Sequence, residues 1–222
     1  FTTQKADLVF TQTKRHFYER RKNNKNTYLI PNAVDYDNFV NPESKDSFLS
    51  DIISIKKPIL GFIGRYNNKY IDSLLMRKVA ESFPECSIVF IGIFVDSGDF
   101  KRLNAYHNVF FIDSKPTNQI PMYLQFFNVC LLPLKMEEDK RMGSPQKLFD
   151  YLASGKPIVA TKVSGTEDFG DVVNLAENHD EFIDGVKSAL RENDLSMQMK
   201  RKERAKENSW EIRTDQIWSL IQ

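Results

Sequence analysis

The sequence predicts an α/β fold in which a parallel β-sheet is covered by helices on both faces. From about residue 58 onward, apolar runs of strand length alternate with segments of helical periodicity, as in repeated β-α-β units. Most of these runs are uniformly apolar rather than alternating, as expected of strands buried on both faces. Right-handed crossovers then predict a doubly wound, Rossmann-like layer structure with its ligand crevice at the carboxyl ends of the strands.

Six strands are expected along this part of the chain. They are Pro58 to Ile63, Ser87 to Ile93, Asn108 to Ile112, Asn128 to Leu134, Pro157 to Thr161 and a weaker Asp171 to Leu175. Apolar stripes at helical spacing mark the covering helices. One stripe comprises Ile71, Leu74, Leu75, Val79 and Phe83, and another comprises Phe182, Val186, Ala189 and Leu190.

Two segments lie outside this sheet. Residues 6–30 are predicted to form a strand, a basic helix and a strand, and the turn residues Pro31 and Asn32 open a polar linker. Near the other end, Trp210 and Trp218 share one face of a helix and need a surface to bury against. The chain opens on Phe1 rather than Met, so we expect it to be a piece of a longer protein.

The charge balance excludes a global field that would attract nucleic acid, because 31 Lys and Arg stand against 30 Asp and Glu. Basic residues at 14–22 and 200–206 are interleaved with glutamates, which is typical of exposed helical ion pairs. Contact with a membrane surface is the alternative interpretation. The most apolar stretch, residues 120–134, is too short to cross a bilayer.

The cysteine and histidine content also limits the class of protein. Only Cys86 and Cys130 occur, which favours a reducing, cytoplasmic setting. His16, His107 and His179 lack metal-ligand spacing, so we expect no metal and interpret each as a surface or turn residue.

The most informative segment runs from Gly143 to Pro157. Ser144 is predicted as the N-cap of a helix, Pro145 as its first residue and Gly155 as its left-handed end. The helix follows the fourth strand, so its first amides would point into the crevice and bind an anion such as a diphosphate. The alternative is a well-capped core helix in which Lys147 and Asp150 form a surface pair.

A second set of candidate ligands follows the first strand. Gly64 and Arg65 end that strand, and Lys69 lies one turn further on. Arginine suits bidentate contacts to phosphate and lysine suits a point-charge contact. Other nucleotide motifs do not fit, because Pro157 follows Gly155-Lys156 where a Walker A loop needs Ser or Thr.

These segments, in this order, resemble retaining GT-B glycosyltransferases. The runs Ala6-Asp7-Leu8-Val9-Phe10 and Ile30-Pro31-Asn32-Ala33-Val34-Asp35 with Phe39 are similar to the family's "ADxV" and "IPNGVD…F", with Ala33 in place of the usual glycine. The runs Ile63-Gly64-Arg65, Leu131-Leu132-Pro133 and Ser144 to Ala153, continuing to Gly155-Lys156-Pro157-Ile158-Val159, resemble its C-terminal lobe. The resemblance is closest to the branch that builds bacterial capsule, teichuronic acid and related polysaccharides.

The resemblance implies one lobe of a GT-B fold and a donor site. The donor-binding residues would be Gly64, Arg65, Lys69, Gly143, Ser144, Lys147 and Asp150. In the family two acidic residues separated by seven others flank the helix, and Asp150 matches the second, which contacts the ribose. Met142 stands at the first position, where Glu137, Glu138 or Asp139 could substitute.

The resemblance also implies a domain organisation. Residues 1–40 would be a remnant of the N-terminal lobe with the interlobe linker, residues 41–207 the nucleotide-sugar-binding lobe, and residues 208–222 a C-terminal helix. The glycan or lipid-linked acceptor and the residue that activates it would come from the rest of the N-terminal lobe. No catalytic residue is therefore assigned here.

The function expected is transfer of a hexose from a nucleotide-diphosphate sugar to a cell-surface polysaccharide, with no metal or other cofactor. The protein would be cytoplasmic, with peripheral membrane association as a possibility. A GT-B nucleotide-sugar epimerase is one alternative, and it would need acidic and histidine residues facing the sugar. A non-catalytic nucleotide-binding module is another, and Met142 motivates it.

Overall fold

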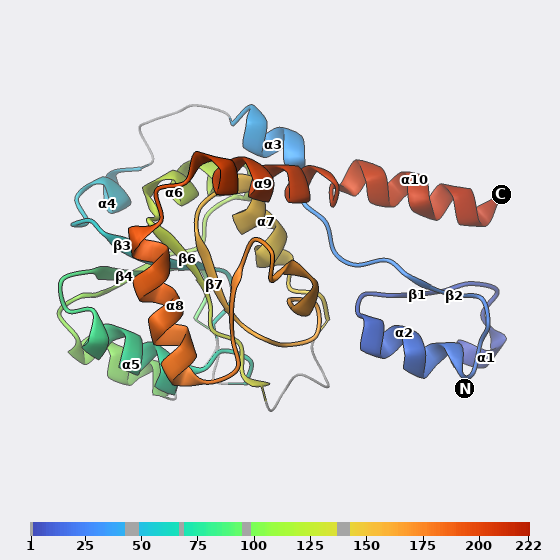
Figure 1. Cartoon of the computed structure of the whole chain (residues 1–222), viewed down its shortest axis with the longest axis horizontal. Coiled ribbons are helices and arrows are strands. Elements are labelled where there is room, and N and C mark those ends of the chain that lie inside the picture. The colour runs from blue at the N-terminus through green and yellow to red at the C-terminus, as the bar shows by residue number, and fades with distance from the viewer. Residues whose placement is uncertain (1, 43–48, 67–68, 95–98, 137–142) are drawn as a thin grey trace.

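The computed structural model describes residues 2–42, 49–66, 69–94, 99–136 and 143–222 (Figure 1). Its larger unit is a six-stranded sheet in the order β5-β4-β3-β6-β7-β8, and every pair is parallel. The strands are β3 (Ile59–Ile63), β4 (Ser87–Ile91), β5 (Val109–Ile112), β6 (Val129–Leu132), β7 (Ile158–Thr161) and β8 (Asn174–Ala176). The predicted α/β, Rossmann-like fold is confirmed.

The strands at the centre of this sheet are buried along their whole length. Every residue of β3, β4, β6 and β7 is buried, as their uniformly apolar sequences predict. The prediction for the sixth strand begins three residues before the observed β8 and ends one residue before it. Val172 and Val173 both donate to Phe169 O, so they belong to a turn and the strand begins only at Asn174.

Helices cover both faces of the sheet (Figure 1). The larger unit contains α3 (Tyr36–Val40), α4 (Ser50–Ile53), α5 (Ser73–Ser82), η2 (Asp99–Ala105), η3 (Thr117–Gln119), α6 (Ile120–Phe126), α7 (Gln146–Ser154), η5 (Glu167–Phe169), α8 (His179–Arg191) and α9 (Leu195–Lys206). Helix α5 packs beside α8 and η2, whereas α7 packs between α6 and α9. The carboxyl ends of the strands thus form an open edge between two helical layers.

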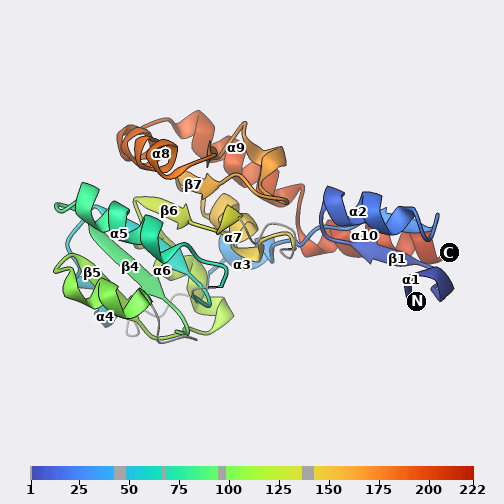
Figure 2. The same cartoon turned by 90° about the horizontal axis from the view of Figure 1, so that it is seen from below.

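A smaller unit lies beside the larger one (Figure 2). It contains α1 (Thr2–Lys5), β1 (Val9–Thr11), α2 (Lys14–Arg21) and β2 (Thr27–Leu29), and its two strands are parallel. This matches the predicted strand, basic helix and strand. Its sheet is separate from the six-stranded sheet, so the two units are joined by the linker that follows β2, by side-chain contacts and by the last helix of the chain.

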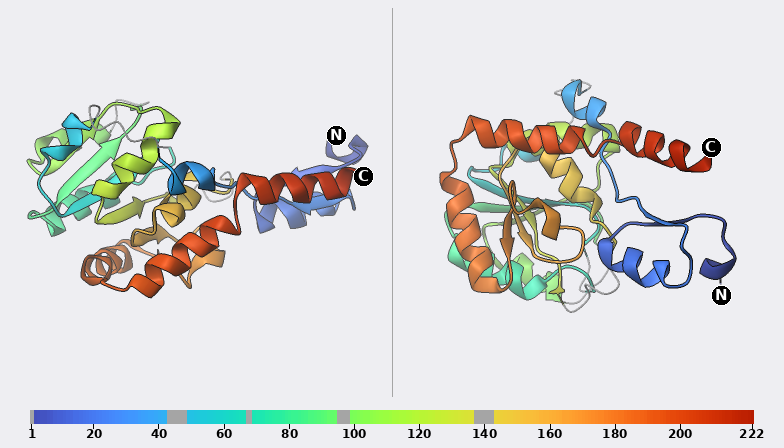
Figure 3. Two further views of the ribbon diagram at one scale, coloured as in Figure 1. Left: turned by 90° about the horizontal axis from the view of Figure 1, so that it is seen from above. Right: turned by 45° about the vertical axis from the view of Figure 1, so that its right-hand side comes forward.

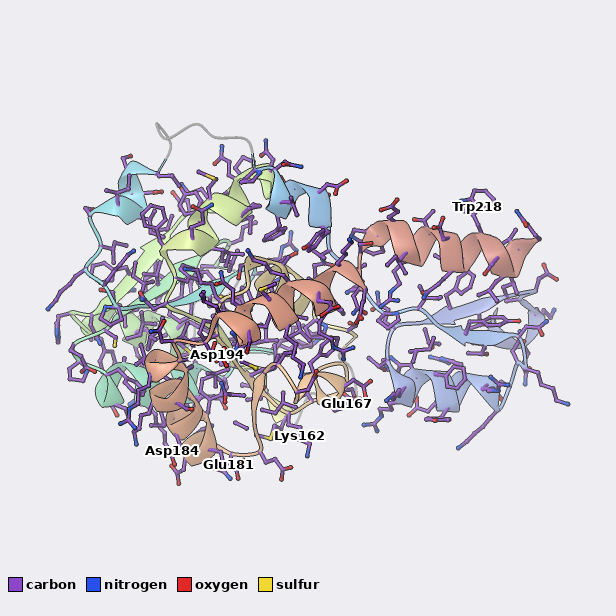
Figure 4. All side chains as sticks on the ribbon, turned by 45° about the horizontal axis from the view of Figure 1, so that its top comes forward. Lys162, Glu167, Glu181, Asp184, Asp194 and Trp218 are labelled. Atoms are coloured by element: carbon purple, nitrogen blue, oxygen red, sulfur yellow. The ribbon has the colours of Figure 1, made fainter. Side chains whose placement is uncertain are left out.

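The last helix, α10 (Trp210–Ile221), leaves the larger unit and runs alongside the smaller one, so that both termini lie at the same end of the molecule (Figure 3). Trp210 N donates to Val34 O, which ties the start of α10 to the linker. Trp218 is 58% exposed and projects from the side of α10 that faces away from the strands (Figure 4). The apolar face predicted for this helix is therefore largely open to solvent.

Candidate functional site

Helix α7 begins one residue later than the sequence predicts. Pro145 is its N-cap, with φ −73° and ψ 114°, and Gln146 is the first helical residue. The predictions that Ser144 caps the helix and that Pro145 is its first residue are wrong. The extended backbone of Pro145 moves Ser144 out of capping position, and the buried Ser144 Oγ has no hydrogen-bond partner. Gly155 ends the helix in the left-handed region, as predicted.

A cleft of about 250 Å³ opens where the ends of β3 and β6 meet the start of α7. This is the point at which the strand order reverses, where open α/β sheets bind ligands. Its walls are formed by Phe62, Arg65, Tyr70, Ile71, Leu132, Leu134, Gly143, Pro145, Gln146 and Lys147. Its lining combines apolar side chains with the charged groups of Arg65 and Lys147.

Among the predicted donor-binding residues, the structure brings Arg65, Gly143 and Lys147 together on the walls of this cleft. Gly64 lies directly beneath Lys147, because a Cβ at position 64 would overlap Lys147 Cε. Lys69 is exposed beside the cleft, with its Nζ 4.9 Å from the centre of the Tyr70 ring.

The electrostatic environment of Lys147 is unfavourable for its positive charge. Burial lowers the pKa of Lys147, the nearby Asp150 raises it, and the positive charge of Arg65 lowers it again. The net shift is downward. Lys147 and the exposed Arg65 therefore face one partly apolar cleft, and a bound anion would offset the cost of burying the charge of Lys147.

Asp150 lies behind Gln146 rather than on the wall of the cleft. Gln146 Nε2 donates to Asp150 Oδ1 at 3.5 Å and also to Ala33 O of the linker. Burial raises the pKa of Asp150 to about 6, and the Gln146 hydrogen bond and the charge of Lys147 only partly oppose this. The ribose contact expected of Asp150 stays a prediction.

A buried tyrosine that the sequence analysis missed sets the spacing between β3 and α7. The N–H of Ile63, the last residue of β3, donates to Tyr151 Oη at 2.9 Å. Tyr151 is fully buried, so this bond holds the residues just before Arg65 against the helix that carries Lys147. The pattern of apolar residues in the helix places Tyr151 in the core, but it does not predict that the Tyr151 hydroxyl accepts a hydrogen bond from Ile63 N.

The two loops that flank the cleft are also bonded to each other. Asp72 N donates to Pro133 O and Lys135 N donates to Tyr70 O, both at 2.8 Å. Asp72 caps α5 through Leu75 N, and its other oxygen lies 2.8 Å from His179 Nε2. His179 was interpreted as a surface or turn residue, but it is half-buried against Asp72, which lies 107 positions away in the sequence.

Several of the sequence predictions concern residues outside the described part of the chain, namely Met142, Glu137, Glu138 and Asp139. Within the described residues, no group of three or more His, Cys, Asp or Glu side chains could hold a metal ion. The described helices also include none that is long and apolar enough to cross a membrane.

Comparison with known proteins identifies the family. A profile of the family described as "Glycosyl transferases group 1" matches residues 57–192, which is more than half of the chain. The chain belongs to this family. The match covers the strands from β3 to β8 and therefore the whole cleft. The resemblance noted in the sequence is thus confirmed.

One relative of this group 1 chain is the putative teichuronic acid biosynthesis glycosyltransferase TuaH of Bacillus subtilis strain 168. It is 29% identical over 143 residues, which are 63% of this chain and 35% of TuaH. The chain therefore spans about a third of the length of this relative.

The solved structures of similar fold include Anabaena HepE in complex with UDP-glucose, with a TM-score of 0.79 and 14% identity over 97% of this chain and 64% of HepE. Sucrose-phosphate synthase from Thermosynechococcus elongatus has a TM-score of 0.74 and 18% identity, over 99% of this chain and 58% of the synthase. At these identities the likeness establishes the fold.

Proposed function

We propose that this chain is the donor-binding part of a glycosyltransferase that moves a hexose from a nucleotide-diphosphate sugar to a cell-surface polysaccharide. The observation that carries the proposal is the convergence of Arg65 and Lys147 on the first turn of α7, in a cleft at the reversal of strand order. Membership of group 1 and the similarity to TuaH, whose name refers to teichuronic acid biosynthesis, support it. HepE, a structural neighbour, has been solved with UDP-glucose bound.

The chemistry of the cleft suits a diphosphate. The N–H groups at the start of a helix lack partners one turn earlier; in α7 Leu148 N donates to Pro145 O, which leaves those of Gln146 and Lys147 to face an anion. The helix dipole adds about 0.3 to 1 kcal/mol for an anion. Arg65 would bind two phosphate oxygens, and each charge-assisted contact is worth about 1.5 to 3 kcal/mol. The same contacts would stabilise the diphosphate as it leaves the sugar. The role of this site is thus binding and leaving-group stabilisation.

The complete proposed donor site consists of Gly64, Arg65, Lys69, Gly143, Ser144, Lys147 and Asp150. Lys69, exposed beside the cleft, would contact the outer phosphate. Asp150 would contact the ribose, which requires Gln146 to turn aside. We propose no metal or other cofactor, and we assign no catalytic residue to this chain.

We also propose the division of the chain into residues 1–40, 41–207 and 208–222, with the acceptor bound by a further lobe. The partners would be a nucleotide sugar and a glycan or lipid-linked acceptor, and not nucleic acid. Several basic residues are paired with acids, as in Lys14–Asp168 at 2.5 Å and Lys200–Asp171 at 3.2 Å. From the two free cysteines we propose a cytoplasmic protein, with peripheral membrane association through a lipid-linked acceptor as the second possibility.

The two alternative functions are less well supported. An epimerase would need acidic and histidine side chains at the sugar, and the described residues that line the cleft include neither. A non-catalytic nucleotide-binding module is motivated by Met142, and sugar transfer by the full-length enzyme would exclude it.

A panel of nucleotides tests the proposal directly. Thermal unfolding of the chain is measured with UDP, GDP, ADP and their sugars. The nucleotides that carry one of the three bases should raise the melting temperature. A ligand at 100 times its dissociation constant stabilises the folded state by about 2.7 kcal/mol. If no nucleoside diphosphate raises the melting temperature at millimolar concentration, the proposal of a donor site is wrong.

A further inference from the structure

The linker after β2 passes close to the turn formed by residues 143–145, which precedes α7. Asn32 Nδ2 donates to Ser144 O at 2.6 Å, and Gln12 Nε2 donates to Asn32 Oδ1 at 3.0 Å. Gln12 follows β1 directly. A continuous chain of hydrogen bonds therefore joins the end of β1 to the backbone just before α7.

Gln12 also contacts the turn by packing. A Cβ at Gly143 would overlap Gln12 Oε1, so the two residues are in close contact. On the opposite side, a Cβ at Gly165 would lie 3.0 Å from both Pro145 Cδ and Ser144 Cα. The turn is thus held between Gln12 and the loop that follows β7.

The side chain of Ser144 does not hold this turn, since its buried Oγ has no partner. Its carbonyl oxygen does, through Asn32. The next residues add a second tie, because Gln146 Nε2 donates to Ala33 O. Two neighbouring residues of the linker, Asn32 and Ala33, are therefore hydrogen-bonded to the start of α7.

The smaller unit, β1-α2-β2, meets the larger unit partly through the same contacts and partly through α10, which runs alongside it. Its sheet does not join the six-stranded sheet, and Lys14–Asp168 is an ion pair in which both side chains are about half exposed, 50% and 47%. Exposed pairs of this kind contribute little. Gly143 lines both the diphosphate cleft and a cavity of about 580 Å³ that it shares with Gln12 and Asn32, between the two units.

From this geometry we infer that Gln12 and Asn32 are positioning residues that couple the diphosphate-binding turn to the orientation of the smaller unit. Neither lines the diphosphate cleft, and both act through the backbone of residues 143–145. A diphosphate that orders this turn then also orders the end of β1 and the start of α2. The inference rests on the proposed function, and it concerns two residues that lie outside the proposed donor site.

The test measures UDP affinity by calorimetry, or the affinity of whichever nucleoside diphosphate the panel selects, together with amide hydrogen exchange. Asn32→Asp keeps the side-chain shape and replaces the donor with an oxygen facing Ser144 O. We expect affinity to fall about tenfold, and about threefold for Gln12→Ala. Asn26→Ala is the matched control, since Asn26 Nδ2 donates to Asp7 O at 3.1 Å in the smaller unit, and it should bind like the wild type.

Hydrogen exchange separates coupling from a general loss of structure. In the wild type, UDP should slow exchange in residues 143–149 and also in residues 9–16. In Asn32→Asp and Gln12→Ala, saturating UDP should still slow exchange in residues 143–149. It should no longer slow exchange in residues 9–16. Gln12 is exposed, so its variant should fold even if Asn32→Asp does not.

The outcomes distinguish this inference from the proposed function. If the wild type binds nucleotide and both variants match it in affinity and in protection of residues 9–16, the coupling is wrong and the donor site stands. If the wild type binds no nucleoside diphosphate, the donor site is wrong. In that case the exchange of residues 143–149 is compared without ligand. Equal exchange in the wild type and in Asn32→Asp would show that the hydrogen bond from Asn32 does not hold the turn, and the coupling would be wrong as well.

Discussion

Lys147 lies across Gly64, so that the first turn of α7 and the end of β3 share one side of the cleft. Gly64 has φ 138°, a backbone conformation that residues with a Cβ rarely adopt. Arg65 follows at once along the chain. This contact is what brings the two cations of the proposed diphosphate site together.

We expect Gly64→Ala to displace Lys147 and to strain the backbone. The loss of stability should be about 1 to 3 kcal/mol, and the affinity for a nucleoside diphosphate should fall at least tenfold. Gly170→Ala is the matched control, because a Cβ there makes only an ordinary contact at 3.5 Å with Leu175. Urea unfolding and calorimetry measure the two effects. Equal behaviour of the two variants would contradict the role given to Gly64.

Arg65→Ala should weaken the binding of a nucleoside diphosphate at least tenfold, because a charge-assisted contact to phosphate is lost. Arg102→Ala, which removes an arginine whose side chain is 69% exposed on η2, should leave affinity unchanged. Calorimetry provides the comparison. Unchanged affinity in Arg65→Ala would remove this residue from the site.

Asp150→Ala should reduce affinity for a nucleotide and leave the binding of inorganic pyrophosphate nearly intact. The reason is that Asp150 lies about one turn beyond the end of α7 that faces the diphosphate, at about 1.5 Å per residue. Both ligands are titrated against the same variant. Equal losses would instead make Asp150 a structural partner of Lys147.

The stability of the protein should also depend on the titration of Asp150. Its pKa is raised from 3.8 to about 6, so the fold favours the neutral carboxyl. The contribution to stability is complete below about pH 4 and is lost as the pH rises through 6. Asp150→Asn should remove this dependence and stabilise the protein at pH 7.5 by up to about 3 kcal/mol. Denaturation at several pH values measures it, and parallel curves for both proteins would refute the assignment.

We expect the 222-residue chain to bind a nucleoside diphosphate but to transfer no sugar alone. In GT-B enzymes the reaction occurs between two lobes, and closure aligns the acceptor and excludes water. The chain and a full-length, two-lobe enzyme are incubated with the same donor and acceptor. Transfer by the chain at a rate near that of the longer enzyme would mean that its active site is complete.

The sequence was sufficient to predict the central sheet and the edge at which the cleft lies. Uniformly apolar runs such as Leu60 to Ile63 and Val129 to Leu132 indicate buried strands through local composition alone, and all their residues are buried. Gly64, Arg65 and Lys147 could also be chosen as candidates from local sequence. Each lies next to the end of a strand or the start of a helix, and the neighbouring residues in the sequence predict where that element ends or begins.

The tertiary structure decided how these candidates are used. Asp150 lies behind Gln146, His179 contacts Asp72 across 107 positions, and Asn32 bonds Ser144 across 112. Such contacts depend on how strands and helices pack, and a short-range pattern carries no information about partners so far along the chain. The capping error at Ser144 also lies beyond a local pattern, because the turn before α7 contacts Asn32 and Gly165, and Pro145 is extended there.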